Sequence, residues 1–491
     1  MDLPGKADCC WTATAPESSF AKLEGSSAVD VAIVGAGIVG LTAAYQLARA
    51  GLSVTLLESR RIGGQVTGRS TAKITSQHAL IYRYLIETFN PGLAQLYADA
   101  NRTGVRQIRN WVAELGIDCS LESKDAYTYT CDPALFVDIE AEAAAARAVG
   151  FHAEVLAEAP LPFRTAGALR FPDEAQFNPA QYLIGLAGAA QAAGARIFEQ
   201  TRVTTVEPEK GWRVGADDGR LHARHVVLAT NLPSPGPIAF DGRTQPRCHV
   251  AMAFRMDAKQ AIDGMFIGID HPTHSLRMGR DRDGPLLVAL GPRFNTGHDA
   301  DVAKRFRDLD RWVRQHLPVG DAAWRWVNED YDTPDRLPFV GRPSTKAPGL
   351  YVATGFNGWG ISNGTAAGMM LADQIRERPN SWATLYDPVR SSPDDFNEGG
   401  ETRSRVVSIK DIPAGEGGVI VQGKENVAVW KDADGTPHAF SAACTHAGCT
   451  VTWNNADHTW DCPCHGSMFT AKGDVIHGPA VQPLARARLP D

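Results

Sequence analysis

The chain reads Asp30-Val-Ala-Ile-Val-Gly35-Ala-Gly37-Ile-Val-Gly40 near its N-terminus, an apolar run that passes into a G-x-G-x-x-G glycine pattern. A stretch typical of a helix follows at 41–50, with Gly51 as its expected C-terminal cap, and a second strand is expected at 53–57. Strand, glycine turn, helix and strand in this order predict a βαβ dinucleotide-binding unit. We therefore expect an α/β Rossmann-like domain at the front of the chain.

Each glycine of the pattern has an expected role in binding a nucleotide. Gly35 allows the tight turn, Gly37 lets the backbone approach a pyrophosphate, and Gly40 lets the helix pack closely on the strand. The helix N-terminus offers free amides and the positive end of its dipole to the phosphates. Glu58 ends the second strand, where an acidic side chain accepts hydrogen bonds from the ribose hydroxyls.

A second glycine cluster indicates which nucleotide to expect. It reads Leu350-Tyr-Val-Ala-Thr354-Gly355-Phe-Asn357-Gly358-Trp359-Gly360, again an apolar strand before glycines and a helix. The pairing resembles the D-amino-acid oxidase superfamily of FAD enzymes, in which the late segment returns to the first strand and lies against the isoalloxazine ring. Shorter matches across residues 30–375 support the resemblance, and they are Gly63 to Ser70, Thr201 to Val203, Val226 to Thr230 and Asp335 to Gly341.

The resemblance implies a bound FAD, with contacts from the loop after the second strand, from the backbone of Val203 and from both glycine clusters. The expected cofactor-binding residues are Gly35, Gly37, Gly40, Glu58, Thr67, Gly68, Arg69, Ser70, Val203, Thr230, Gly355, Gly358, Trp359 and Gly360. Lys73 and Trp359 are catalytic candidates beside these segments, and a solvated or packing role is the alternative for each. The section 247–318 is expected to form an antiparallel substrate-covering sheet, in which Arg277 and Arg280 are candidates for binding a carboxylate.

Two cysteine–histidine loops stand near the C-terminus, Cys444-Thr-His446-Ala-Gly-Cys449 and Cys462-Pro-Cys464-His465-Gly-Ser467. Two thiolates and two imidazoles are the ligand inventory of a Rieske 2Fe-2S cluster, and the predicted iron ligands are Cys444, His446, Cys462 and His465. A structural Cys2His2 zinc site takes the same donors and is the alternative. The remaining cysteines favour the cluster, because Cys449 and Cys464 hold matched places where a disulfide could join the loops, and zinc needs no such clamp.

Residues 404–491 resemble the disulfide-bearing Rieske proteins of respiratory and photosynthetic cytochrome complexes, and Gly478-Pro479-Ala480 is similar to their cluster-covering loop. The resemblance implies the Cys449–Cys464 disulfide and a hydrogen bond from Ser467 to a cluster sulfide. Phe469 stands where those proteins carry a tyrosine, so we expect a lowered potential within the Rieske range of about −150 to +300 mV. The whole chain resembles bacterial FAD-dependent oxidoreductases with a Rieske tail, including their Gly-Arg-Ser-Thr-Ala-Lys stretch at 68–73.

The composition excludes several classes of protein. A chain of 491 residues with 44% apolar content predicts two or three globular domains. A net charge of −7 and no basic run argue against nucleic acid as a partner. No apolar run reaches the roughly 18 residues of a membrane span, and the N-terminus lacks a signal-peptide pattern. We expect a cytoplasmic protein in which cysteines outside the C-terminal loops remain thiols, namely Cys9, Cys10, Cys119, Cys131 and Cys248.

Composition shifts and motifs together predict four segments. They are an N-terminal extension at 1–29, a FAD-dependent oxidoreductase domain at 30–385 with an inserted substrate-binding sheet, a polar linker at 386–403, and a small all-β Rieske domain at 404–491.

The expected activity is oxidation of a carbon–nitrogen bond in an amine or amino acid. FAD would pass electrons singly to the cluster and then to an external acceptor, such as a redox protein or a quinone. One alternative is an electron relay whose flavin is fed by a partner reductase, and another is an oxygen-using oxidase with a structural cluster. A Rieske oxygenase is disfavoured, because the histidines at Asp270–His274 and His222–His225 lack the spacing of a mononuclear iron site.

Overall fold

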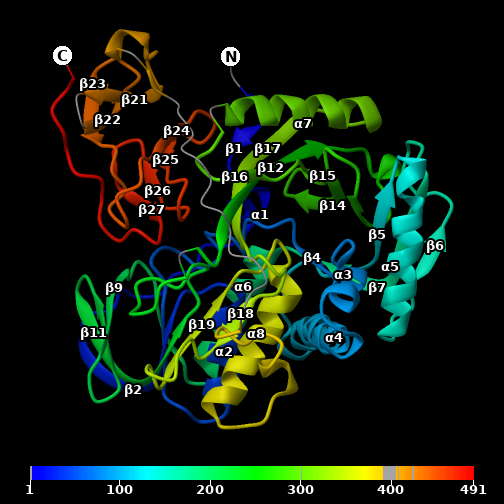
Figure 1. The fold of residues 1–491 in the computed structure, drawn as a ribbon, viewed down its shortest axis with the longest axis horizontal. Coiled ribbons are helices and arrows are strands. Elements are labelled where there is room, and N and C mark those ends of the chain that lie inside the picture. Colours follow the sequence, from blue (N-terminus) through cyan, green and yellow to red (C-terminus); the bar gives the residue numbers. More distant parts are fainter. Residues whose placement is uncertain are drawn as a thin grey trace.

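The computed structural model describes residues 3–240, 242–299, 301–390, 405–406, 408–422 and 425–490. Figure 1 shows two parts in contact, a large α/β part that holds residues up to 390 and a smaller β part at the C-terminus. The expected fold class is confirmed, because the large part has a Rossmann-like sheet beside a second large sheet, and the C-terminal part is built of short strands.

The Rossmann-like sheet has eight strands among the described residues. In spatial order its path is β18 (Phe339–Gly341), β19 (Leu350–Thr354), β11 (Gly219–Leu228), β2 (Gly25–Val34), β3 (Val54–Leu57) and β8 (Arg196–Phe198). Strand β10 (Trp212–Ala216) also pairs with β11, and β9 (Val203–Pro208) pairs with β10. The strands β19, β11, β2, β3 and β8 run parallel. The core of β2 reads as an unbroken apolar run because both of its faces are buried.

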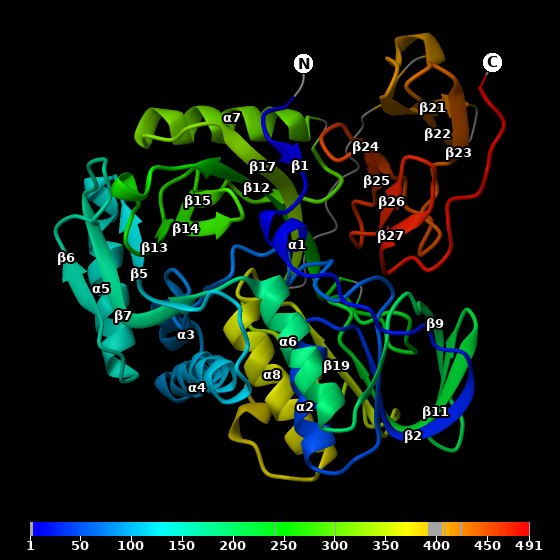
Figure 2. The ribbon, with the colours of Figure 1, turned by 180° about the vertical axis from the view of Figure 1, so that it is seen from behind.

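Three helices pack together beside this sheet, as Figure 2 shows: α2 (Ile38–Arg49), α6 (Pro179–Ala192) and α8 (Gly360–Ile375). Helix α2 begins directly after the glycine turn. A Cβ on Gly40 would stand 1.9 Å from the carbonyl oxygen of Gly35, so only glycine lets the helix start this close to the strand. Helix α6 begins at Pro179, because the Asn178 side chain caps it and Pro179 fits its first turn.

The second sheet has eleven strands among the described residues. Its path is β1 (Lys6–Ala7), β17 (Ala322–Asp332), β12 (Gln245–Arg255), β15 (Gly284–Leu290), β14 (Ser275–Asp281), β13 (Met265–Gly268), β5 (Glu122–Thr130), β7 (Gly167–Gln176) and β4 (Lys73–Ile74), with β16 (Phe294–Asn295) on β12 and β6 (Glu154–Leu156) on β7. The expected antiparallel pairing holds for most of it. The sheet is nevertheless mixed, because β1 runs parallel to β17 and β13 runs parallel to β5.

Further helices flank the two sheets. They are α1 (Cys10–Thr14), α3 (Ile81–Thr88), α4 (Pro91–Leu115), α5 (Phe136–Ala148) and α7 (Val302–His316). Helix α7 lies along β12 and β15, while α4 packs on α8. None of the helices in the described residues has the length and apolar character that crossing a bilayer requires.

The N-terminal extension is part of the core of the large domain. Its strand β1 forms the edge of the second sheet, and the side chains of Cys9, Cys10 and Trp11 are at most 2% exposed. Residues 25–29 already belong to β2, so this strand begins five residues before the glycine-rich motif suggests. Cys9 and Trp11 lie against the loop expected to contact the flavin, because their side chains hydrogen-bond to the carbonyls of Gly68 and Ser70.

The C-terminal part consists of two small sheets. One holds β20 (Arg405–Val406), β21 (Gly417–Gln422), β22 (Glu425–Lys431) and β23 (Pro437–Ser441), and the other holds β24 (Thr452–Asn454), β25 (Thr459–Asp461), β26 (Met468–Thr470) and β27 (Val475–His477). The two cysteine–histidine loops are the connections β23–β24 and β25–β26. Of the expected linker, Tyr386 is buried and Arg390 pairs with Asp335 of the large part, while 391–403 lies outside the described residues.

Hydrogen bonds join the C-terminal part to the large part at several places. Thr452 donates to the carbonyl of Gly297 at 2.8 Å, and the backbone amide of Ala303 donates to the side-chain oxygen of Asn455 at 3.0 Å. Tyr331 of β17 donates to the carbonyl of His465 at 2.8 Å. One of the two cysteine–histidine loops therefore lies directly on the second sheet of the large part.

Candidate functional site

A cavity of about 880 Å³ lies where the carboxyl ends of β2, β3 and β11 meet the second sheet. Its wall includes most of the residues expected to bind the cofactor, namely Gly35, Gly37, Glu58, Thr67, Gly68, Arg69, Ser70, Val203, Thr230, Gly358, Trp359 and Gly360. The carboxyl edge of a parallel sheet is where open α/β folds bind ligands. The structure thus brings together segments from Gly35 to Gly360, which are 325 residues apart in the sequence.

Two of the expected contacts, Gly40 and Gly355, do not line the cavity. Gly40 is covered by the turn that it packs against. A Cβ on Gly355 would stand 2.2 Å from the Thr333 side chain, so this glycine lets β19 approach β17 rather than a ligand. The cavity therefore lies beside the glycine motif, while these two glycines pack beneath the cavity wall.

Glu58 holds the turn at the end of β3. Its carboxylate accepts hydrogen bonds from the backbone amides of Ala36 and Arg60, each at 2.9 Å. Burial raises the pKa of this carboxyl, against those two hydrogen bonds. The side chain stands at the cavity wall, where an acidic residue of this fold meets a ribose.

The loop 67–70 is held from behind by two tryptophans. Trp326 donates from its indole nitrogen to the carbonyl of Arg69 at 2.7 Å, and Trp11 donates to the carbonyl of Ser70 at 2.9 Å. The Thr67 hydroxyl accepts from the amide of Ile38, at the first turn of α2, at 3.3 Å. These contacts fix the loop beside the helix N-terminus and turn its free groups toward the cavity.

Lys73 is a cavity residue with an unusual charge state. Its ammonium nitrogen hydrogen-bonds to the Ser275 hydroxyl of β14. Burial, with a smaller contribution from the nearby Arg277 guanidinium, lowers the pKa of Lys73 to about 7. The lysine is therefore able to exist as a neutral amine near physiological pH, the state that a proton acceptor requires.

Trp359 also lines the cavity, and His78 supports it from behind. The two rings are stacked with centroids 4.5 Å apart. Both His78 nitrogens have partners, the Tyr97 hydroxyl at 2.6 Å and the carbonyl of Thr75 at 2.9 Å. Burial lowers the pKa of His78 to about 3, so His78 is a neutral side chain that positions Trp359.

Arg277 does not bind a ligand in this cavity. Its guanidinium is buried and donates to the carbonyls of Ala72 at 2.6 Å and Phe177 at 3.1 Å, and to that of Met278. The sequence pattern shows an arginine in a strand, and only the tertiary structure shows that backbone carbonyls enclose it.

The segment Asp270–His274 is likewise engaged in protein contacts. The Asp270 carboxylate accepts from the Thr130 hydroxyl at 2.7 Å and from the backbone amide of Cys131 at 3.0 Å. The His274 ring stacks on Trp312 with centroids 3.8 Å apart. These contacts give Asp270 and His274 a structural role, while His271, Pro272 and Thr273 between them line the cavity.

Two cavity residues on adjoining segments were not predicted from the sequence. Asp330 of β17 accepts a hydrogen bond from the amide of Gly358 at 2.6 Å, and burial raises its pKa to about 6. Asn357 donates from its backbone amide to the carbonyl of Tyr331 at 3.0 Å. A lone aspartate in a strand carries no motif, so no local signal identifies Asp330.

The C-terminal loops bring the four predicted iron ligands together. The Cys444 and Cys462 thiols hydrogen-bond to each other, which lowers the pKa of Cys444 to about 6 and raises that of Cys462. The His446 and His465 rings meet edge to face with centroids 4.9 Å apart. Two sulfurs on one side and two imidazoles on the other form the donor set that a Rieske cluster requires.

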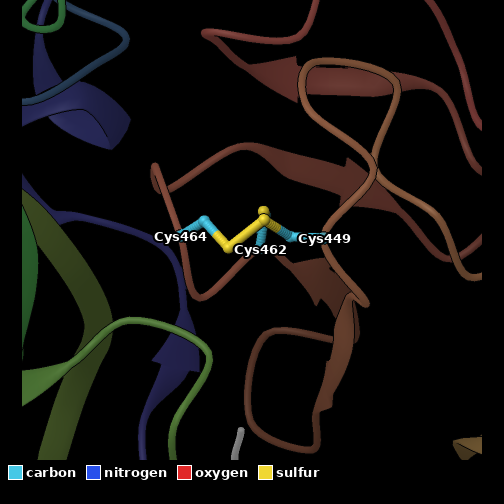
Figure 3. A group of neighbouring side chains, drawn as sticks. All are labelled: Cys449, Cys462 and Cys464. Carbon is cyan, nitrogen blue, oxygen red and sulfur yellow. A yellow bond between two sulfur atoms is a disulfide. The ribbon is translucent and has the colours of Figure 1, made fainter. Parts of the chain in front are cut away.

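A disulfide joins the two loops beside this donor set. Cys449 and Cys464 are bonded, and Figure 3 shows the Cys462 side chain next to the bridge. The sulfurs of Cys449, Cys462 and Cys464 lie within 4.8 Å of one another. These three do not form a metal site of their own, because a disulfide sulfur is not a thiolate and only thiolates bind metal strongly.

The two histidines have different surroundings. His446 is in an exposed stretch, 445–448, whereas the backbone of His465 is held by Tyr331 of the large part. Ser467 is fully buried, and its hydroxyl accepts from the amide of Ala480 at 3.0 Å. Phe469 is fully buried in the core of the module and carries no hydroxyl.

The loop 476–481 of the C-terminal part closes one side of the cavity in the large part. Ser234 donates to the carbonyl of Pro479 at 3.1 Å, and Arg202 donates to the carbonyl of Val475 at 3.3 Å. The sequence identifies this loop as a cluster cover. Its second position, against the nucleotide-binding side, follows only from how the two parts dock.

Comparison with known proteins assigns each part. Residues 30–374 match the family described as FAD dependent oxidoreductase, and residues 402–488 match the Rieske [2Fe-2S] domain. The Rieske 2Fe-2S iron-sulfur protein YhfW of Bacillus subtilis strain 168 is 30% identical over 504 residues, which cover 98% of this chain and 97% of that protein.

Two further known proteins each match about three quarters of this chain. Gamma-glutamylputrescine oxidoreductase of Escherichia coli K12 is 23% identical over 381 residues, or 74% of this chain and 88% of that protein. The crystal structure of L-proline dehydrogenase from P. horikoshii superposes with a TM-score of 0.63 and 21% identity, covering 74% of this chain and 98% of that one. The second likeness concerns the fold alone.

Proposed function

The chain belongs to the family of FAD dependent oxidoreductases and ends in a Rieske [2Fe-2S] domain, and from this premise we propose that it oxidises a carbon–nitrogen bond of an amine or amino acid. In this proposal the electrons leave singly through the Rieske cluster to an external acceptor, a redox protein or a quinone. The proposal rests on two electron carriers of different capacity in one chain, and on a buried lysine in the flavin cavity.

Different cavity residues would bind different parts of FAD. Bound FAD would supply the capacity to accept an electron pair as one hydride and to release the two electrons singly. We propose that the α2 N-terminus holds the pyrophosphate, Glu58 the ribose, and loop 67–70 with Gly358–Gly360 the ring system. For the cluster we propose Cys444, Cys462, His446 and His465 as ligands and Ser467 as the hydrogen-bond donor to a sulfide.

The lowered pKa of Lys73 in the flavin cavity is the structural observation that favours an amine substrate. An amine enters as an ammonium ion and must lose a proton before hydride can leave the neighbouring carbon. A neutral lysine in the same cavity takes that proton. The products are the imine, which water hydrolyses, two electrons for the acceptor and protons for the solvent. The relative that acts on gamma-glutamylputrescine gives independent support for this substrate class.

The test is anaerobic mixing of the holoprotein with a panel of primary amines, secondary amines and amino acids. At least one member is expected to bleach the flavin absorbance, and the cluster spectrum is expected to change afterwards. Reduction of the cluster before the flavin would contradict the order. Flavin reduction by a partner reductase, with no response to any member of the panel, would establish the relay instead.

Glu58 gives a prediction for cofactor retention. We expect Glu58→Ala to raise the dissociation constant for FAD roughly tenfold or more, because a hydrogen bond to a charged group contributes about 1.5–3 kcal/mol. Titration of the apoprotein with FAD, followed by flavin fluorescence, measures the change. Glu114→Ala alters an exposed acid on α4 and serves as the control. An unchanged constant in Glu58→Ala would show that this carboxylate does not bind the ribose.

We also propose a cytoplasmic location. The five cysteines outside the Rieske domain are all unpaired, as is usual in a reducing compartment.

A further inference from the structure

Tyr331 contacts both candidate sites. It lies in β17 with its side chain fully buried. Its carbonyl accepts from the amide of Asn357, a residue of the flavin cavity, at 3.0 Å. Its hydroxyl donates to the carbonyl of the predicted iron ligand His465 at 2.8 Å. One side chain and two hydrogen bonds therefore connect the cavity wall with the cluster loop.

The cavity end of this connection is rigid. Asp330 precedes Tyr331 and accepts from the amide of Gly358 at 2.6 Å. Asn357 accepts with its side-chain oxygen from the amide of Thr333 at 2.9 Å. The strand β17 is thus fastened on both sides of Tyr331 to the glycine cluster that precedes α8.

The cluster end is packed just as closely. Gly466 follows the ligand His465 and has φ of +73°. A Cβ there would stand 2.8 Å from the Tyr331 hydroxyl and 2.6 Å from a carboxylate oxygen of Glu329. Glycine is therefore required for this approach, and the Tyr331 hydroxyl contacts the loop directly, by its hydrogen bond to His465.

We propose that Tyr331 is the positioning residue that couples the flavin cavity to the Rieske cluster, forming the route by which single electrons pass to the His465 side of the cluster. This inference rests on the proposed function. In each passage reduced flavin loses one electron and one ferric iron of the cluster becomes ferrous. A one-electron acceptor outside the protein takes that electron before the second follows, and the flavin's protons are released to water.

The Tyr331 hydroxyl contacts the near side of the cluster loop, at His465. On the far side His446 lies in the exposed stretch 445–448. Electrons thus enter beside the half-buried His465 and leave beside the exposed His446, so the two ligands have separate tasks.

The competing route runs along residues 475–481, which also reach the cavity through the contact between Ser234 and Pro479. A docking effect is the other rival, because any weakened contact between the two parts would slow transfer. A separate variant tests each of these two alternatives. Ser234→Ala removes the hydrogen bond to Pro479, the contact on which the competing route depends. Asn455→Ala removes interface hydrogen bonds to Asp301 and Ala303 that lie on neither route.

The experiment reduces the flavin of the anaerobic full-length holoprotein with light and a sacrificial donor, so no substrate is needed. Cluster reduction is then followed by its absorbance. We expect Tyr331→Phe to slow this step about tenfold, which corresponds to about 1.4 kcal/mol of barrier. The cluster's EPR spectrum and midpoint potential and the protein's unfolding temperature are expected to remain unchanged. The rate of cluster reduction is measured only for molecules that contain both FAD and the cluster. A variant that has lost part of its clusters can therefore still be compared with the wild type.

The outcomes separate this inference from the proposed function. A wild-type cluster that photoreduced flavin does not reduce would contradict the proposed electron transfer itself. Wild-type transfer with an equal rate in Tyr331→Phe overturns only the role of Tyr331. Slowing in Asn455→Ala to the same degree assigns the effect to docking, and slowing in Ser234→Ala alone assigns the route to the 475–481 loop. Either result also overturns the inference.

Discussion

Replacing Cys462 with serine is expected to remove the cluster completely while FAD stays bound. Cys462 is one of only two thiols available to the iron in these loops, since Cys449 and Cys464 are joined in a disulfide. A serine hydroxyl is far less readily deprotonated than the thiol and does not replace its thiolate. Cys462 does not line the flavin cavity, so the loss is confined to one cofactor.

Iron and sulfide analysis, together with EPR of the reduced protein, measures the result. We expect flavin content and substrate-dependent flavin bleaching to persist, and reduction of an external one-electron acceptor to cease. Cys131→Ser is the matched control, because Cys131 is an exposed free thiol far from the cluster loops in the sequence. Iron and sulfide retained in Cys462→Ser would refute the ligand set, and a wild-type protein with zinc instead of iron would refute the cluster. Peroxide formation that continues undiminished in the variant would favour the oxidase alternative.

The parts of the fold that the sequence predicts are those whose cause is local. Gly35 and Gly40 mark a turn whose geometry only glycine allows, and the two cysteine–histidine loops carry their ligands within a few residues of each other. The motif also predicts that Gly355 contacts the cofactor, but Gly355 packs against Thr333 and does not line the cavity. A motif locates a turn, but it does not show which side of the turn meets the cavity.

The parts that sequence reasoning missed depend on how distant segments dock. Tyr331 and Asp330 are ordinary residues of a strand, and their importance arises because β17 lies between the glycine cluster and the Rieske loop. The 475–481 loop has a recognisable relation to the cluster but none to the nucleotide cavity it also lines. The edge strand β1 is two residues long, too short for a periodic pattern to reveal.

Replacing Lys73 with methionine is expected to slow flavin reduction by substrate about 10²- to 10⁴-fold, the usual contribution of a positioned proton acceptor. Methionine keeps the length and volume of the buried side chain and removes the amine. Lys73→Arg is the complementary variant, because arginine stays protonated and cannot accept a proton. We expect both variants to bind FAD like the wild type, and single-turnover mixing with the substrate found by screening measures the rate.

The protonation of Lys73 predicts how the rate of flavin reduction changes with pH. Its pKa is about 7, so below that pH the side chain is an ammonium ion that cannot accept a proton, and above it the neutral amine can. The wild-type rate of flavin reduction should therefore rise through about pH 7 and then level off. His249, which also lines the flavin cavity, stays neutral because burial lowers its pKa to about 3. Asp330, with a pKa of about 6, remains in the variants, so any rise that persists near pH 6 belongs to it. A Lys73→Met profile that keeps the rise at pH 7 would show that another group accepts the proton.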